Sequence, residues 1–467
     1  MRIQAALNFI SLVFLVISIS SLLVVFFCIG GELDFLPFLY LFILSMFLSS
    51  SIYFANRNIK LELDARSSIY SIFLAWPILI LMGSIPLLFI FPDHSFFDIL
   101  FISSSLSTTT GSWFFNNVII PGEAIIWQSA LQWLGGLLTL VIACSFVEAL
   151  FDKSSSERTF FDLSKVKVIF FIYLILTIIF SFIMYFLDLT IEESIRLSIS
   201  LLSTSNAISS SDTSIFVTYD SKVMSVMILG MFLGSLSVNL HYKAFISGIS
   251  SYFKDKSVKY IFLTVLVTYI MISMFSNLSS SHFSYNLLVN KLFIIFSLLS
   301  TTGYIPNLGS YTEEFSSILI LLLALAFIGG SASSTTGGMK ISRLVSLFRY
   351  ISNELHHLAH PMEIISKKKE TIPSNISLLF VSVILFMILF LIITICYTII
   401  GIKFETAFLL VTAFITNTGR GILELNNLHF FPSSPIETIL SVIAMLIGRI
   451  ETILIMLFIS KTFWLES

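Results

Sequence analysis

Four short stretches of small hydroxyl and amide residues interrupt otherwise apolar sequence. They read TTTGS at 108–112, STSNA at 203–207, STTGY at 300–304 and TNTGR at 416–420. Glycine, present in three of them, reaches backbone angles that a Cβ forbids, so such a turn can aim its carbonyl oxygens at one point. Carbonyl oxygens arranged in this way replace the hydration shell of a cation. The four stretches therefore indicate an ion site built from backbone.

The surrounding sequence is built to lie in lipid. Of 467 residues, 57% are hydrophobic and only 11% are charged, which is typical of a polytopic membrane protein. A membrane span takes about 20 apolar residues. Such runs lie near 5–29, 35–55, 68–92, 124–147, 166–188, 222–240, 259–277, 374–402 and 435–463, with an interrupted run at 315–351. We interpret the first run as a retained helix, because it is too long for a secretion signal and no cleavage site follows.

Charge reports topology and excludes other functions. The net charge of −2 gives no basic surface for nucleic acid. Basic residues gather in alternate loops, at 57–66, 153–167, 243–259 and 340–369, which predicts that these loops and the N-terminus face the cytoplasm. The three cysteines lie in apolar runs, so neither a disulfide framework nor a metal cluster is indicated.

The four polar stretches recur at matched places in a repeat. Each ends an apolar segment that is too short to cross a membrane, and each lies between two spanning runs on the outward side. Gly111 and Gly303 are 192 residues apart, and residue 207 lies at the midpoint. We therefore divide the chain into two extra helices and four repeats. The boundaries are 1–56 for the two helices, then 68–150, 166–250, 259–352 with the interrupted run, and 374–467.

This pattern predicts an all-α membrane protein with four helix–pore loop–helix units around one central pore. Irregular backbone survives at membrane depth only where it lines water or is buried in protein, and the C-terminal ends of four short helices would attract a cation. For a single turn the alternative is an ordinary loop end, but four matched copies favour a filter. The predicted ion-binding residues are Thr109, Thr110, Gly111, Ser205, Asn206, Ala207, Thr301, Thr302, Gly303, Asn417, Thr418 and Gly419.

The interrupted run holds a candidate gate. A helix of about 13 apolar residues stops, ten small residues follow, and a basic amphipathic segment resumes. The alternative is a flexible cytoplasmic linker, and a phosphate loop is disfavoured because no glycine directly precedes the lysine. The gate residues are Gly329, Gly330, Ser331, Ser333, Ser334, Thr335, Thr336, Gly337 and Gly338.

Arg449 places a charge in the middle of the last apolar run. Such a residue normally faces a cavity or a partner. We expect it to face the pore below the turns as an electrostatic barrier, and the alternative is a structural ion pair with another helix.

These motifs resemble the Trk/Ktr/HKT superfamily of potassium transporters, and most closely the bacterial Trk membrane subunit. The likeness spans almost the whole chain and rests on TTTGS, QWLGG, GMFLGSLSVNLHY, STTGY, GGSASSTTGGMK, TNTGRG and LIGRIE. It implies potassium uptake across the bacterial inner membrane, K⁺ in the filter as the only metal ion, and no covalent cofactor. It also implies a homodimer and a cytoplasmic nucleotide-binding (TrkA-type) regulatory ring.

Two residues depart from the family pattern. Aligning Asp212 with the family's acidic residue puts Ala207 where the second filter commonly has glycine, and Arg420 stands where a neutral residue is usual. Three alternatives stay open: a Na⁺/K⁺ channel without selectivity, a cation symporter of the same fold, and a solute carrier, which would want two inverted halves. An enzyme is not expected, because no cluster of acids or histidines recurs at one depth.

Overall fold

Helices make up nearly all of the structure. This computed structural model describes residues 2–57, 65–112, 120–144, 163–206, 216–217, 219–275, 285–306, 318–360, 376–426, 428 and 430–460. Ala207 and most of the basic loop beyond residue 360 lie outside these ranges. The two shortest elements are β1 (Phe216–Val217) and β2 (Ile305–Pro306), which pair in parallel.

The spanning helices agree with most of the predicted runs. Among these described residues, seven helices are long and apolar enough to cross a membrane, or eight if one bent pair counts as a single span. The seven are α1 (Arg2–Gly30), α2 (Leu36–Asn56), α3 (Ala65–Ile90), α5 (Gly122–Ile142), α7 (Leu163–Tyr185), α12 (Lys256–Phe275) and α17 (Ile376–Ile399).

Two runs expected to be continuous are broken, and the interrupted run is confirmed as broken. The run at 222–240 forms α9 (Ser221–Gly234) and α10 (Val238–Ser247), which meet at 101°. The run at 435–463 forms α20 (Pro435–Arg449) and α21 (Thr452–Ile459), because Ile450 adopts an extended backbone. The interrupted run forms α15 (Leu319–Ile328) and α16 (Ile341–Ala359). Run length misses these two breaks because hydropathy averaged over a span says nothing about the backbone conformation of single residues.

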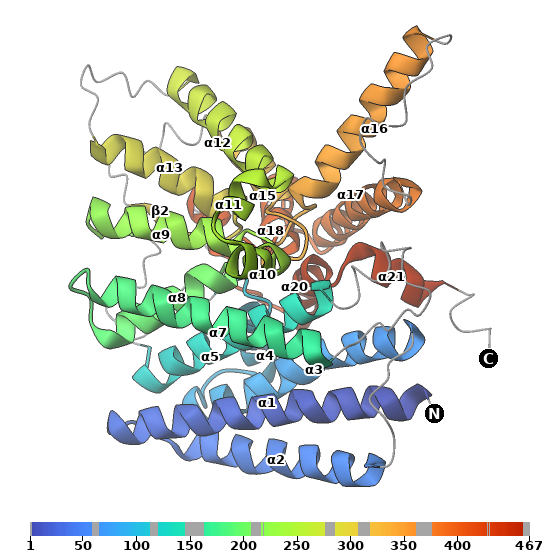
Figure 1. Cartoon of the computed structure of the whole chain (residues 1–467). Coiled ribbons are helices and arrows are strands. Elements are labelled where there is room, and N and C mark those ends of the chain that lie inside the picture. Colours follow the sequence, from blue (N-terminus) through green and yellow to red (C-terminus); the bar gives the residue numbers. More distant parts are fainter. Residues whose placement is uncertain are drawn as a thin grey trace.

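Four units follow one plan after α1 and α2, which lie side by side at one edge of the molecule (Figure 1). Each unit has a long first helix, a short helix, a polar turn and a second helix. The short helices are α4 (Phe96–Ser107), α8 (Ile191–Ser203), α13 (Tyr285–Leu299) and α18 (Phe404–Ile415). The remaining helices are α11 (Ser250–Lys254) and α19 (Arg420–Glu424).

The sequence fixes where two of the short helices begin. Ser95 and Asp98 form a reciprocal capping box at α4, and Thr190 and Glu193 form the same box at α8. In each box two backbone N–H groups at the helix start, those of the N-cap and N3 residues, find a side-chain acceptor. The box also places a carboxylate near the positive end of the helix. The caps thus define the N-terminal ends of these short helices, and the C-terminal ends lead into the turns.

Glycines bring the second helix of three units against the end of the short helix. A Cβ on Gly135 would lie 1.7 Å from the carbonyl oxygen of Ser107, and a Cβ on Gly448 would lie 2.3 Å from that of Ile415. In the second unit a Cβ on Gly234 would lie 2.7 Å from the carbonyl oxygen of Leu201. Backbone packing this close is possible only without a side chain.

We predict that Gly135→Ala destabilises the fold. The added methyl group must push α5 away from the end of α4, and overpacking of this kind costs about 1–3 kcal/mol. The midpoint of thermal unfolding of the detergent-solubilised protein should fall. Gly30→Ala is the control, because nothing lies within 4 Å of its added Cβ. Equal midpoints for the two variants would contradict this account of the packing.

Candidate ion pathway

The four polar turns share one backbone conformation. The second residue of each stretch lies in the left-handed region, at φ 54° for Thr109, 53° for Thr204, 58° for Thr301 and 54° for Asn417. Residues other than glycine rarely adopt this conformation. Four occurrences directly after four short helices confirm that the units repeat at the level of the backbone.

Hydrogen bonds set the same register. In three turns the next residue donates its N–H to a carbonyl five residues earlier: Thr110 to Ser105 at 2.8 Å, Ser205 to Ser200 at 2.9 Å and Thr302 to Ser297 at 2.8 Å. Ser205 is therefore the counterpart of Thr110 and Thr302.

The residue after it in the second turn is Asn206, which occupies the place that glycine holds in the other three. The alignment through Asp212, which put Ala207 there, was wrong by one residue. That alignment places the turn relative to Asp212, which lies beyond it in a segment that the structure does not describe. The left-handed residue and the hydrogen bonds place the turn relative to the end of α8, which the structure does describe. Gly111, Gly303 and Gly419 have φ of 71°, 79° and 64°.

The four turns meet in a closed ring. A methyl group added to the glycine of one turn would collide with the next turn, so adjacent turns are in van der Waals contact. The distances from the added Cβ are 2.1 Å from Gly111 to Oδ1 of Asn206, 3.3 Å from Gly303 to Nδ2 of Asn206, 2.2 Å from Gly303 to the carbonyl oxygen of Thr418, and 1.9 Å from Gly419 to that of Thr110. The ring order is thus first, second, third, fourth.

Side chains of the turns hold the ring together. Asn417 donates from Nδ2 to the hydroxyl of Thr110 at 2.9 Å, which joins the fourth turn to the first. The hydroxyls of Ser200 and Tyr304 are hydrogen-bonded at 2.8 Å, which joins α8 to the third turn. All the predicted filter residues that the structure describes are buried.

The glycine-serine loop lies against the ends of the short helices, so the linker interpretation does not hold. Gly337 donates its N–H to the hydroxyl of Thr301 at 2.9 Å. The hydroxyl of Thr335 donates to the carbonyl of Leu202 at 2.9 Å and to that of Gly234 at 3.0 Å. Ser331 and the residues from Ser333 to Gly337 are buried. The predicted gate residues therefore form one compact loop beneath the ring.

The two ends of this loop close on each other. Gly329 and Gly338 have φ of 67° and 73°, and a Cβ on Gly329 would lie 2.4 Å from the carbonyl oxygen of Gly337. Lys340 folds back over the loop and donates from Nζ to the hydroxyl of Thr336 at 3.1 Å. Sequence reasoning did not assign Lys340, although it lies only two positions after Gly338.

Arg449 joins the loop to the ring. Its guanidinium donates to the carbonyl of Thr108, to the hydroxyl of Thr109 and to the carbonyl of Thr335. It thus contacts the first turn and the loop at once, and these partners are carbonyls and a hydroxyl rather than the carboxylate of a structural ion pair. Whether its charge also acts as a barrier stays a prediction.

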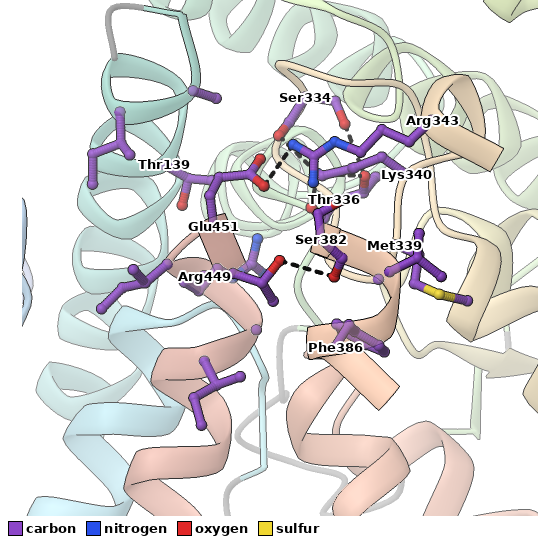
Figure 2. A pocket seen from close by; sticks show the side chains of 18 residues that line it. Thr139, Ser334, Thr336, Met339, Lys340, Arg343, Ser382, Phe386, Arg449 and Glu451 are labelled. Carbon is purple, nitrogen blue, oxygen red and sulfur yellow. Dashed lines mark hydrogen bonds and ion pairs between the residues drawn. The ribbon is translucent and has the colours of Figure 1, made fainter. Parts of the chain in front are cut away.

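A pocket opens beside Arg449, between the loop and the starts of α16 and α21 (Figure 2). Arg343 and Glu451 point toward one another there and form an ion pair at 2.6 Å. Glu451 lies only two positions after Arg449, so the two side chains point to different faces of the chain and do not pair with each other. Its partner is instead the first basic residue of α16, more than 100 positions away, which spacing within one helix cannot reveal.

Arg420, whose place in the fourth turn the sequence left without explanation, is paired. Its Nε donates to Oε1 of Glu424 at 2.6 Å, one turn along α19, and both side chains are buried. The carboxylate neutralises the guanidinium beside the ring.

Comparisons with known proteins agree with this architecture. The chain is 27% identical over 456 residues to the Trk system potassium uptake protein TrkH of Vibrio parahaemolyticus, covering 92% of each protein. It is 24% identical over 452 residues to the protein of the same name from Escherichia coli K12, covering 91% of each. The crystal structure of the potassium transporter TrkH from Vibrio parahaemolyticus superposes with a TM-score of 0.87 at 24% identity, covering 99% of this chain and 100% of that one.

The match also extends to a family model. The TrkH model, described as a cation transport protein, matches residues 36–465. Together with the closed ring of turns, this match shows that the chain is no enzyme but a polytopic membrane protein that belongs to the TrkH family of cation transport proteins.

Proposed function

We propose that this chain takes up potassium ions through the ring of four turns. The observation that carries the proposal is that four short helices end at one closed ring of buried, hydroxyl-rich turns. Helix C-terminal ends carry partial negative charge, and turns of this kind can offer carbonyl oxygens to a dehydrated cation. The relatives named above as potassium uptake proteins support K⁺ as the ion.

The loop from Gly329 to Gly338 is the proposed gate of this pathway. It packs beneath the ring, and α16 continues from it directly. In this proposal a cytoplasmic nucleotide-binding ring of another chain acts on the gate, two copies of this chain form a homodimer in the inner membrane, and the N-terminus is cytoplasmic. The name "Trk system" that these relatives carry supports a multicomponent uptake system for them.

One observation favours a second candidate function, passage of Na⁺ as well as K⁺. Asn206 replaces the glycine of the second turn, so the ring is not made of four equivalent carbonyl positions. A ring with three equivalent positions holds a weaker field favouring K⁺.

Ion flux from purified protein in liposomes tests the proposal. K⁺, Rb⁺ and Na⁺ are compared in one preparation, with the variant Gly303→Ala beside the natural chain. We expect K⁺ and Rb⁺ to pass and Gly303→Ala to lower the K⁺/Na⁺ ratio, because its Cβ would lie 2.2 Å from the carbonyl oxygen of Thr418. Absence of monovalent cation flux under every gating condition would refute the proposed function.

Substitutions at Arg449 separate a clamp from a charge barrier. Arg449→Ala should raise K⁺ flux, since both roles are lost. Arg449→Lys keeps the charge but cannot reach three acceptors in a fixed fork, so it should raise flux only if the contacts to Thr335 and Thr108 hold the gate shut. Flux from both variants equal to that of the natural chain would contradict both roles.

Glu424→Gln should lower K⁺ uptake by exposing the charge of Arg420. A positive charge beside the ring repels cations, and salt screens a buried charge much less than an exposed one. Uptake should therefore be reduced at low and at physiological ionic strength alike. The double variant Arg420→Gln/Glu424→Gln, which carries neither charge, is the control and should recover uptake. A deficit in Glu424→Gln that the double variant keeps would contradict the electrostatic explanation.

A further inference from the structure

The side chain of Asn206 is a buried carboxamide with unused hydrogen-bonding capacity. Asn206 is 1% exposed, and among the described residues neither its Oδ1 nor its Nδ2 has a hydrogen-bond partner. A carboxamide buried without partners costs free energy, because its polar atoms have lost water and gained no hydrogen bond in exchange. Such a group calls for a ligand that the described residues do not supply.

The carboxamide points into the ring. Its Oδ1 lies 2.1 Å from where a Cβ on Gly111 would be, and its Nδ2 lies 3.3 Å from where a Cβ on Gly303 would be. Gly111 belongs to the first turn and Gly303 to the third, and these two turns face each other across the ring, with the second turn between them. A group that reaches toward both of them lies inside the ring rather than behind it.

The backbone of Asn206 points the other way. Its carbonyl oxygen accepts a hydrogen bond from Nε2 of Gln132 at 2.6 Å and a longer one from Nε2 of Gln128 at 3.4 Å. Both glutamines belong to α5, which packs behind the turns. The φ of Asn206 is not positive, whereas the three glycines in the matching places have positive φ. The second turn has thus directed its carbonyl outward and its side chain inward.

A second asparagine shows that this arrangement is specific. Asn417, in the fourth turn, donates from Nδ2 to the hydroxyl of Thr110 at 2.9 Å and to the carbonyl of Met445 at 3.0 Å. The Nδ2 of Asn417 thus joins two elements, and only its Oδ1 lacks a partner among the described residues. The carboxamide of Asn206 forms no hydrogen bond to any of the described residues, through either Oδ1 or Nδ2.

We propose that Oδ1 of Asn206 is a ligand for the monovalent cation in the ring, taking the place of the backbone carbonyl that the second turn withholds. The inference rests on the proposed function. An amide oxygen is a hard, neutral donor like a peptide carbonyl, but it rotates on a side chain, so it adapts to ions of different size. The filter of this chain is therefore three backbone positions and one adjustable side-chain position.

Barium block of K⁺ flux in liposomes tests this placement. Ba²⁺ is a divalent probe that enters carbonyl-lined sites, and a carboxylate inside the ring attracts it far more strongly than an amide. Asn206→Asp should lower the Ba²⁺ concentration for half block by about tenfold or more, since the added charge acts in a poorly screened site. Asn286→Asp is the matched control: it adds the same charge at the exposed start of α13 and should leave the half-blocking concentration within about twofold, as expected for a screened surface charge.

Asn206→Gly provides an independent readout if the aspartate variant does not insert. Glycine removes the side chain and permits the backbone conformation of the other three turns, so the K⁺/Na⁺ flux ratio should rise about threefold or more. Unchanged barium block in Asn206→Asp, or an unchanged flux ratio in Asn206→Gly, while the natural chain conducts K⁺, overturns this inference alone. A natural chain that conducts no monovalent cation overturns the proposed function and this inference with it.

Discussion

Four helices end together inside the protein, and the carbonyl oxygens that these ends leave free are the constraint on which the rest of the structure depends. At membrane depth such groups need partners. The hydroxyl of Thr335 reaches the carbonyl of Leu202, and the guanidinium of Arg449 reaches that of Thr108. The loop of the third unit and the break after Arg449 in the fourth are therefore parts of one solution. Each brings a hydrogen-bond donor from one unit to the C-terminal end of a short helix in another unit.

The same constraint explains why the symmetry of the ring is incomplete. Three turns have a glycine at positive φ after the short helix. The second turn has Asn206 at this place, and the carbonyl of Asn206 accepts a hydrogen bond from Gln132. Gln132 is the first residue of the QWLGG motif, and Gly135 of that motif lets α5 approach α4 closely enough for its glutamines to reach the neighbouring turn. One motif thus serves both packing within the first unit and the conformation of the second turn.

The sequence was sufficient for the features that repeat. Apolar run length predicts all seven of the long apolar helices found among the described residues, and small polar residues after short apolar segments predict the turns. It was insufficient for features that depend on contacts between distant segments. The register at Asn206 follows from hydrogen bonds to α8, and the pairing of Arg343 with Glu451 joins residues from different units. The break at Ile450 lies inside an apolar run that is long enough to span, so run length does not reveal it. Arg420 could have been paired from the sequence, because Glu424 follows at helical spacing.

The direct continuation of the loop into α16 has a mechanical consequence. Only Met339 and Lys340 separate Gly338, the last residue of the loop, from Ile341, the first residue of the helix. The 19 residues of α16 form a rod about 28 Å long, and this rod extends away from the other helices in Figure 1. A tilt of about ten degrees moves the far end of such a rod by about 5 Å. Conversely, a displacement of the far end of α16 is transmitted to the loop as a rotation of the helix about its first turn, where Arg343 is paired with Glu451.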